Sequence, residues 1–483
     1  MDHPLSRRIS IALELDTDGP AIECEGRWSS WRQLGMLSRA VADVVTPGAE
    51  VGILLRNTPA HVAALLGVLL AGGCVVVVNP SRGDDRTRTD IAALNLPVIV
   101  GTAEDIAALV DPSPATRVVT IADLDTAPTV AGVPTPVGSP GVAVRMLTSG
   151  TTGPPKRVDL SYDMLAVSVM GADFADSVAP AELSSGVAIV NAPLVHIGGV
   201  YRVLQCVAEA RPFVLLPRFD LDTWADAVRR HRPKAVSLVP AALRAVLHSD
   251  LGPVDLTGIR AVTCGTAPLS ADDAEAFTEK FGIPVLTSYA ATEFGGGVAG
   301  WTLADHHRYW KAKRGSVGRA SLGARLRVVS EDGTVLGSDE AGLLEVKPGQ
   351  LGPDADWVRT TDLARIDADG FLWILGRADQ AIIRGGFKVL PDDVRAALES
   401  HPAVLGAAVT GRPDSRLGEV PVAMVEPREP VTAAELVDFL RNRLAPYEIP
   451  VQIAVVDTIP RTPSGKPDLT AVRDYFTVGD RAV

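Results

Sequence analysis

Short apolar runs recur along the first 264 residues, and segments with a helical spacing of apolar positions lie between several of them. The runs are too short for core helices and are rich in valine, which favours buried strands. They are residues 51–55, 74–78, 97–101, 117–121, 186–190, 212–217, 235–239 and 260–264. Strands that alternate with helices typically form mainly parallel sheets covered by helices. The pattern therefore predicts an α/β fold.

Two segments allow a more detailed prediction. Residues 62–78, VAALLGVLLAGGCVVVV, carry no charge and are nearly long enough to cross a membrane. Gly72-Gly73 interrupts this run, so we expect a buried helix followed by a strand, and no membrane span. In residues 222–233, DTWADAVRRHRP, we expect Asp222 to be the N-cap of a helix that Pro233 ends.

The pattern changes near residue 315. From there, apolar and polar residues alternate between glycines, which is typical of half-buried antiparallel strands. Residues 364–377 predict a hairpin with Asp369-Gly370 at its turn. The segments after residue 377 alternate between strand and helix patterns and predict a small, mobile α+β domain. We therefore expect a large N-terminal domain of residues 1–376, containing a small antiparallel β subdomain, and a C-terminal lid domain of residues 377–483.

Composition narrows the classes of function. Hydrophobic residues make up 47% of the chain and charged residues 22%, which is typical of a globular protein. The formal net charge of −12 argues against nucleic acid as a general partner, because phosphates attract positive surfaces. The four cysteines are far apart, so we expect neither a disulfide framework nor a zinc site. The N-terminus lacks the apolar core of a signal peptide, which predicts a cytoplasmic protein.

Residues 146–158, MLTSGTTGPPKRV, contain the first candidate chemistry. Gly150 and Gly153 permit backbone conformations in which successive N–H groups line a site for an anion. Hydroxyl and ammonium donors are added by Ser149, Thr151, Thr152 and Lys156. The spacing differs from the GxxxxGK[ST] motif of common nucleotide triphosphatases. From composition alone, a phosphate loop and a surface turn are equal alternatives.

A set of ordered motifs favours the phosphate loop. SGTTGPPK resembles the phosphate-binding signature of the adenylate-forming superfamily, which includes fatty-acyl-CoA and coumarate-CoA ligases, peptide-synthetase adenylation domains and beetle luciferases. Further segments resemble the family's motifs in the family's order: residues 191–199, 264–270, 288–296, 315–319, 360–395 and 460–468. The resemblance runs from about residue 20 to about residue 475 and implies an acid–thiol ligase, an acyl-CoA synthetase.

The resemblance implies that ATP and Mg²⁺ convert a carboxylic acid to an acyl-adenylate, and that coenzyme A then displaces AMP. The nucleotide would be bound by Thr148, Ser149, Gly150, Thr151, Thr152, Gly153, Lys156, Tyr289, Asp362 and Arg377. Thr292 would contact the adenylate phosphate. Glu293, together with Thr148, would hold Mg²⁺, a hard cation that prefers oxygen ligands.

The C-terminal motifs imply a second set of roles. Lys466 would neutralise charge as the carboxylate attacks the α-phosphorus. The small domain would then swing about a hinge at Asp379. In this second pose the coenzyme A arm would pass Arg384, Gly385, Gly386, Phe387 and Lys388.

The resemblance also places an acyl pocket. Its expected residues are His196, Gly198, Gly199, Gly265, Thr266, Ala267, Gly295 and Gly296, of which His196 would lie near the substrate carboxylate. Because most of these residues are small, we expect room for a bulky, mostly apolar acid. Residues 195–203 contain no aspartate that could bind a substrate amine, which argues against an amino-acid substrate.

Arg157 departs from the family pattern, in which glycine follows the lysine. Its side chain could point into solvent, or it could occupy the pyrophosphate position and impair adenylation. Ala290 and Thr361 also replace the usual glycines. Three alternatives remain: a two-step acyl-CoA ligase, an enzyme that forms the thioester from an adenylate made by a partner enzyme, and a non-catalytic acyl-nucleotide binder. The acceptor could also be a carrier-protein thiol.

Overall fold

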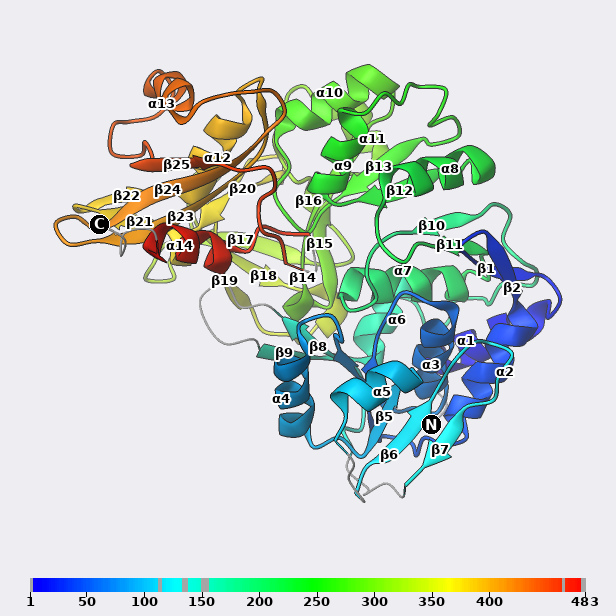
Figure 1. Cartoon of the computed structure of the whole chain (residues 1–483). Helices are drawn as coiled ribbons and strands as arrows, with labels where there is room; N and C mark the ends of the chain where they lie inside the picture. Colours follow the sequence, from blue (N-terminus) through cyan, green and yellow to red (C-terminus); the bar gives the residue numbers. More distant parts are fainter. Residues whose placement is uncertain (1–2, 112–114, 133–137, 149–155, 463–464, 479–483) are drawn as a thin grey trace.

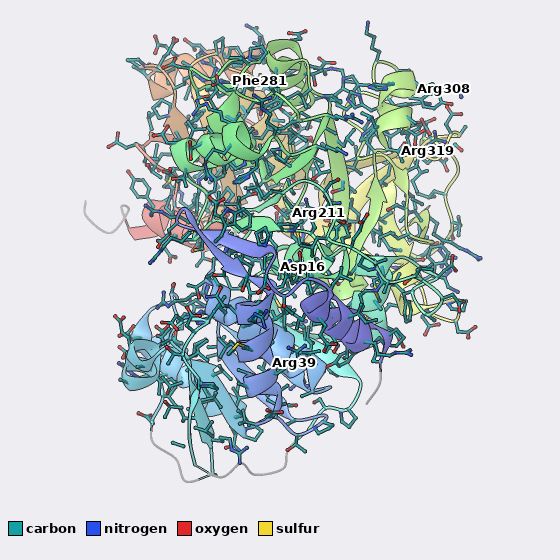
Figure 2. All side chains as sticks on the ribbon, turned by 90° about the vertical axis from the view of Figure 1, so that its right-hand side faces the viewer. Asp16, Arg39, Arg211, Phe281, Arg308 and Arg319 are labelled. Carbon is teal, nitrogen blue, oxygen red and sulfur yellow. The ribbon has the colours of Figure 1, made fainter. Side chains whose placement is uncertain are left out.

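A computed structural model describes residues 3–111, 115–132, 138–148, 156–462 and 465–478. Its strands form five sheets, whose labelled strands can be followed in Figure 1. The N-terminal third lies at the bottom of that view and the C-terminal unit at the top left. Figure 2 shows the side chains after a quarter turn, with Asp16 and Arg211 where the lower and upper parts meet. Within the described ranges, no helix is long and apolar enough to cross a membrane.

The first sheet has seven strands in the order β7-β6-β5-β3-β4-β8-β9, with parallel pairs at its centre and antiparallel pairs at both edges. Its strands are β3 (Glu50–Leu54), β4 (Cys74–Val78), β5 (Val98–Gly101), β6 (Arg117–Thr120), β7 (Thr129–Ala131), β8 (Val142–Thr148) and β9 (Lys156–Ser161). Its neighbouring helices are α2 (Trp31–Ala42), α3 (Pro59–Leu70), α4 (Asp84–Leu94) and α5 (Ala103–Leu109). The predicted helix and strand of residues 62–78 are confirmed as α3 and β4.

Helices cover both faces of this sheet. Val75 and Val77 of β4 pack in the core that contains α3, whereas Val76 and Val78 pack with Ile91 of α4. Successive residues of a strand point to opposite faces. All five residues of β4 are therefore buried, which explains the unbroken apolar run in the sequence.

Two further sheets continue the α/β pattern. One has the order β10-β11-β1-β2 and the other β12-β13-β14-β15-β16. Their strands are β1 (Pro20–Cys24), β2 (Arg27–Ser30), β10 (Ala188–Val190), β11 (Phe213–Leu215), β12 (Ala235–Leu238), β13 (Ala261–Cys264), β14 (Val285–Ala291), β15 (Gly296–Gly300) and β16 (Arg319–Ala320). The helices are α1 (Pro4–Leu15), α6 (Tyr162–Met170), α7 (Ile197–Ala208), α8 (Leu221–His231), α9 (Pro240–Leu247), α10 (Ala271–Phe281) and α11 (Leu303–Tyr309).

The predicted N-cap of α8 is wrong. Asp220, not Asp222, accepts a hydrogen bond from the Thr223 N–H at 3.0 Å. Asp220 has the extended backbone of an N-cap residue, whereas Asp222 lies in the first turn of the helix. The side chain of an N-cap residue accepts from the N–H three residues further along the chain. Asp222 lies two residues, or about half a helical turn, beyond the N-cap, so its carboxylate is not in that position.

The fourth sheet is antiparallel throughout, as the alternating pattern predicts. It contains β17 (Arg325–Val329), β18 (Gly342–Lys347), β19 (Val358–Ile366) and β20 (Leu372–Arg377), with a short 3₁₀ helix η2 (Gly349–Leu351) after β18. The predicted turn is present, because Gly370 has a φ of 80° between β19 and β20. Phe294 and Val298 pack in the core of this sheet.

The C-terminal unit has its own sheet, β22-β21-β24-β23, with β25 paired to β24. It contains η3 (Ala378–Gln380), β21 (Ile382–Arg384), β22 (Phe387–Val389), α12 (Pro391–Glu399), β23 (Val404–Asp414), β24 (Gly418–Pro427), α13 (Ala433–Arg441), β25 (Gln452–Val455) and α14 (Leu469–Val478). Helices α12 and α13 pack in one core and α14 in another. These cores lie on opposite faces of the sheet.

Ionic contacts join the C-terminal unit to the large part of the chain. Arg244 of α9 donates to Asp273 of α10 at 2.7 Å and to Glu399 of α12 at 2.9 Å. Glu399 also accepts from Arg395 at 2.7 Å, and its side chain is only 6% exposed. Arg428 lies 2.6 Å from the His248 ring nitrogen. The two parts are therefore docked through buried as well as surface groups.

Candidate active site

Three of the predicted nucleotide residues, which lie on β14, β19 and β20, meet in one group. In the antiparallel register of β19 and β20, Asp362 stands directly opposite Arg377. Tyr289 of β14 donates its hydroxyl hydrogen to the Asp362 carboxylate. The Arg377 Nε atom lies 3.9 Å from Asp362 Oδ1, too far for a hydrogen bond. The Asp362 side chain is 21% exposed, so a ligand can reach it.

The electrostatics of this group suit a ligand that donates hydrogen bonds. Burial raises the pKa of Asp362, while the Tyr289 hydroxyl and the Arg377 charge act to lower it. Burial also raises the pKa of Tyr289, so the phenol stays protonated and donates. An ionised carboxylate has room for several donors. Asp362 can therefore accept from a diol such as that of a ribose.

Lys466 lies at the same site although it belongs to the C-terminal unit. Burial lowers the pKa of Lys466, the charge of Arg377 lowers it further, and the charges of Asp362 and Glu293 raise it. Lys466 still has exposed surface. A Cβ added at the neighbouring Gly465 would lie 3.9 Å from Val239 of the large part. The loop that carries Lys466 therefore lies close to Val239 of the large part in this pose.

The predicted magnesium and phosphate residues are only partly described. Glu293 is exposed in a short 3₁₀ helix, η1 (Thr292–Phe294), that follows β14. Thr148 ends β8 and pairs in register with Lys156 at the start of β9. Ser149 to Gly153 lie outside the described residues. The two ends of the predicted phosphate loop are thus adjacent in one antiparallel pair.

The Arg157 guanidinium has two hydrogen-bond partners, and both belong to elements other than β8 and β9. Its Nη2 atom donates to Asp90 of α4 at 2.6 Å, and its Nη1 atom donates to the Val77 carbonyl oxygen at 3.1 Å. The Arg157 side chain is 16% exposed, so the alternative of a solvated side chain is wrong. Its guanidinium is held against β4 and α4.

The predicted acyl pocket residues come from three segments, at residues 196–199, 265–267 and 295–296. His196 is the N-cap residue of α7, Thr266 has a φ of 72° after β13, and Ala267 follows it. A Cβ added at Gly198 or at Gly297 would meet no described atom within 4 Å. These two glycines therefore border open space.

The space beside the other glycines is filled, which corrects the argument for a bulky acid. An added Cβ would lie 2.2 Å from the Pro193 carbonyl oxygen at Gly199 and 2.8 Å from Ser288 Oγ at Gly265. At Gly295 it would lie 2.8 Å from Met164. These glycines permit close packing and a left-handed backbone, as at Gly295 with a φ of 75°. They do not enlarge the pocket.

Two residues that the sequence reasoning did not assign support this region. Tyr201 of α7 donates to the Gly295 carbonyl oxygen. Asn57 donates to the carbonyl oxygens of Ala192 and Leu216 at 3.1 and 3.0 Å, and accepts from the Leu194 N–H at 2.7 Å. The position of Tyr201, three residues after the open Gly198, is a signal that could have been used, because such positions share a helix face.

The predicted coenzyme A residues form the hairpin of β21 and β22. Arg384 donates from Nη1 to the carbonyl oxygens of Tyr447 and Ile449 at 2.8 and 3.2 Å. Gly385 and Gly386 have φ values of 57° and 90° at the turn, and Lys388 follows in β22. Phe387 stacks on Tyr447 and is 57% exposed. In this pose Arg384 holds the hairpin to a neighbouring loop, and Phe387 remains accessible.

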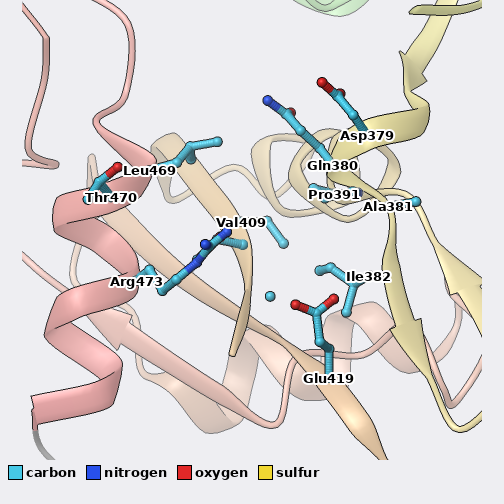
Figure 3. A pocket seen from close by; sticks show the side chains of 12 residues that line it. Asp379, Gln380, Ala381, Ile382, Pro391, Val409, Glu419, Leu469, Thr470 and Arg473 are labelled. Carbon is cyan, nitrogen blue, oxygen red and sulfur yellow. The ribbon is translucent and has the colours of Figure 1, made fainter. Parts of the chain in front are cut away.

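The predicted hinge residue is tied to the nucleotide site. Arg377 donates to both carboxylate oxygens of Asp379, at 3.0 and 2.7 Å, and to Thr361 at 2.6 Å. A cavity of about 90 Å³ lies between this segment and α14. Figure 3 shows Arg473 and Glu419 extending into it. The cavity belongs to the C-terminal unit and is separate from the predicted acyl pocket.

Comparison with known proteins gives related curated sequences. Arabidopsis thaliana 4-coumarate–CoA ligase-like 8 is 33% identical over 344 residues, which cover 67% of this chain and 61% of that protein. The chain thus spans about three fifths of the length of that relative. A feruloyl-CoA synthase from an Amycolatopsis species is 31% identical over 448 residues, 87% of this chain and 88% of that protein.

Solved structures and family assignments agree with these relatives. ATP-bound MatB from Rhodopseudomonas palustris is 26% identical, with a TM-score of 0.81 and 99% of both chains covered. Bacillus subtilis o-succinylbenzoate CoA synthetase, MenE, in complex with its acyl-adenylate intermediate is 25% identical, with a TM-score of 0.77 and 97% of both chains covered. Residues 12–352 match the AMP-binding enzyme family and residues 393–466 match the AMP-binding enzyme C-terminal domain. With both parts matched and in order, this chain belongs to the AMP-binding enzyme family.

Proposed function

We propose that this protein is an acyl-CoA ligase that converts a carboxylic acid, through an acyl-adenylate, to its coenzyme A thioester. The observation that carries the proposal is the position of Lys466. The charges of Asp362, Glu293 and Arg377 act on this C-terminal lysine. A cation placed there can neutralise charge that develops when a carboxylate attacks a phosphate. The relatives named for 4-coumarate and ferulate support the same reaction class.

In the first half-reaction, a carboxylate oxygen attacks the α-phosphorus of ATP and pyrophosphate leaves. Asp362 binds the ribose hydroxyls, with Arg377 beside it and Tyr289 against the adenine. Lys466 balances the negative charge on the reacting oxygens. The phosphate loop from Thr148 to Gly153 would hold the leaving pyrophosphate. Glu293 and Thr148 would hold Mg²⁺, which, when bound, supplies positive charge to the phosphate oxygens.

In the second half-reaction, the thiol of coenzyme A attacks the acyl carbon, loses its proton, and AMP leaves. This step needs different groups at the same place, so the unit after residue 376 swings about Asp379. Lys466 then leaves, and the hairpin from Arg384 to Lys388 approaches. The exposed Phe387 supports this movement, because an apolar ring that is accessible in one pose can be covered in the other.

The anchored position of Arg157 favours the full two-step reaction. Its guanidinium already has Asp90 and the Val77 carbonyl as partners. Moving it to the pyrophosphate position would leave the Asp90 carboxylate, 25% exposed, without this cation. We therefore assign Arg157 a supporting role beside the phosphate loop. No partner adenylating enzyme is then required.

The acid is a compact, mostly apolar carboxylic acid. Filled space beside Gly199, Gly265 and Gly295 supports a compact substrate. The absence of an acidic side chain in residues 195–203 disfavours a substrate amine. Relatives named for 4-coumarate, ferulate and indoleacetate support aryl acids as the first candidates to test.

Two separate assays test the proposal. Acid-dependent ATP–pyrophosphate exchange reports the first half-reaction, and thioester formation from synthetic acyl-adenylates reports the second. We expect the wild type to perform both, and Lys466→Ala to lose exchange while it retains thioester formation. Thioester formation without exchange, with exchange restored in the double variant Arg157→Gly/Asp90→Asn, would support the enzyme that depends on a partner. Failure of both assays with every acid would refute a ligase.

A further inference from the structure

Thr361, which stands where the usual residue is a glycine, contacts the guanidinium of Arg377. The Nη2 atom of Arg377 donates to Thr361 Oγ1 at 2.6 Å. The same nitrogen donates to Asp379 Oδ2 at 2.7 Å, and the Nε atom donates to Asp379 Oδ1 at 3.0 Å. Arg377 is therefore held by two anchors, the Asp379 carboxylate and the Thr361 hydroxyl.

The two anchors leave one side of the guanidinium for a ligand. An arginine side chain has five N–H groups in a planar fork. Asp379 and Thr361 accept from the N–H of Nε and from both N–H groups of Nη2. Among the residues that the structure describes, none accepts from Nη1, and the Arg377 side chain is 34% exposed. Nη1 can therefore donate to a ligand that binds at Asp362, which lies directly opposite Arg377 in the sheet.

The two anchors belong to different parts of the molecule. Thr361 lies in β19, which pairs with β20, the strand that carries Arg377. Asp379 lies in η3, at the predicted hinge, on the short helix that Figure 3 shows beside the cavity. A rotation about the Asp379 backbone re-aims its carboxylate and leaves the pairing of β19 with β20 unchanged. Thr361 is thus the anchor that stays with Arg377.

The strand around Thr361 is fixed by the residue before it. The Thr360 hydroxyl donates to the Leu344 carbonyl oxygen of β18 at 2.9 Å and accepts from the Asp362 N–H at 3.1 Å. A β-branched side chain in a strand also has few rotamers. The Thr361 hydroxyl is therefore a preorganised acceptor for Arg377.

We propose that Thr361 is a positioning residue that keeps Arg377 at the nucleotide while the hinge moves. In the pose of this structure Asp379 and Thr361 hold the guanidinium together. After the C-terminal unit has swung about Asp379, Thr361 still holds Nη2, so Nη1 stays directed at the ribose of the adenylate. This inference rests on the proposed function, because a two-step reaction requires the adenylate to remain bound through the domain movement.

Binding of AMP tests whether the two anchors share one task. The proteins are the wild type, Thr361→Val, Asp379→Ala and the double variant. Each single variant should weaken AMP binding by about two-fold, because the other anchor remains. The double variant should weaken it by about ten-fold or more, the effect of losing one hydrogen bond to a charged group. The ligand control is 2′,3′-dideoxy-AMP, which lacks the ribose hydroxyls and should bind equally to all four proteins.

Two further variants are protein controls, and both are made in the Asp379→Ala protein. Thr361→Ser keeps the hydroxyl and should bind AMP as Asp379→Ala does. Thr223→Val is the matched control, because the Thr223 hydroxyl donates to the Asp220 carboxylate of the α8 N-cap at 2.8 Å. This change should also leave the AMP affinity of Asp379→Ala unaltered. Thermal unfolding verifies that each protein is folded.

The two half-reactions give a kinetic test of the hinge. In Thr361→Val, the KM for synthetic 4-coumaroyl-adenylate in thioester formation should rise about ten-fold, because Asp379 has moved away in that pose. The KM for ATP in ATP–pyrophosphate exchange should rise by about two-fold, since Asp379 still holds Arg377 in the first pose. Equal rises of both KM values would indicate a threonine that merely supports its strand, and would overturn the inference.

Other results also overturn it. These are additive losses of AMP affinity in the double variant, an equal loss for dideoxy-AMP, and a wild type that binds no AMP. The proposed function is judged separately by whether a thioester forms. Non-additive AMP binding without any thioester would refute the ligase and retain Thr361 as the second anchor of Arg377. Thioester formation with additive AMP affinities would do the reverse.

Discussion

The ion pair between Arg244 and Glu399 gives a prediction about the balance between the two half-reactions. It is the buried link between α9 of the large part and α12 of the C-terminal unit, with side chains 12% and 6% exposed. Arg244→Met would remove this link and keep much of the aliphatic side chain. Glu399 would retain Arg395 at 2.7 Å, so the C-terminal unit should remain folded.

The magnitude follows from the geometry. The bond from Arg244 to Glu399 is 2.9 Å long, and a hydrogen bond between charged groups contributes ~1.5–3 kcal/mol net. In the docked pose of the variant, Glu399 keeps Arg395 as its partner, so the larger cost of leaving a buried charge unpaired does not apply. The docked pose should therefore lose ~1.5–3 kcal/mol. That loss corresponds to a change of about 10- to 140-fold in the equilibrium between poses.

The measured quantity is the ratio of two rates, ATP–pyrophosphate exchange and single-turnover thioester formation from a synthetic adenylate. In Arg244→Met this ratio should shift about ten-fold or more toward thioester formation. Arg229→Met is the matched control, because Arg229 of α8 is 47% exposed and pairs with Asp255 within the large part. An unchanged ratio in Arg244→Met, or an equal shift in the control, would refute the reasoning.

Three further predictions concern other groups. Burial lowers the pKa of Lys466. The rate of exchange should therefore decline with rising pH below the ~10.4 of an ordinary lysine, whereas the rate for Lys466→Arg should decline at higher pH. Coinciding pH profiles of the two proteins would contradict this. Burial and Arg428 lower the pKa of His248 to about 4, so between pH 6.5 and 4 the unfolded state binds more protons than the folded state. The free energy of unfolding should therefore fall as the pH is lowered from 6.5 to 4, and less steeply in His248→Gln. Equal slopes in denaturant titrations would exclude His248 as a source of this pH dependence. Asn57→Ala should lower the free energy of unfolding by ~1–3 kcal/mol, because three backbone groups, two of them in buried hydrogen bonds, lose their partner. It should also raise KM for the acid more than KM for ATP, because the affected segment leads to His196; steady-state kinetics showing an equal rise would argue against this positioning role.

Much of the fold follows from local pattern. The strand predicted at 74–78 agrees with β4, and the one predicted at 51–55 differs from β3 by one residue at each end. Such strands are buried on both faces, so their apolar runs are unambiguous. The turn at Asp369-Gly370 is equally local. The N-cap of α8 was missed because Asp220 and Asp222 stand on either side of one leucine, and an aspartate at either position is a suitable N-cap residue.

The site depends on contacts that local pattern does not contain. The partners of Arg157 come from α4 and β4, about 70 to 80 residues earlier. The glycines of the predicted acyl pocket suggested open space, yet Gly199 is small because the Pro193 carbonyl lies against it. A glycine can therefore indicate either a closely packed neighbour or an empty volume. Only the packing of separate elements distinguishes these cases.

The bond between Arg157 and Asp90 has a consequence for how this chain and its relatives can differ. A lone change of Arg157 to glycine would leave a carboxylate beside β4 with no guanidinium, and a lone change of Asp90 would leave a cation next to the phosphate loop. Each single step is unfavourable, whereas the double step exchanges one satisfied arrangement for another. Substitutions at positions 90 and 157 should therefore occur together among related sequences, as a correlated pair separated by 67 positions.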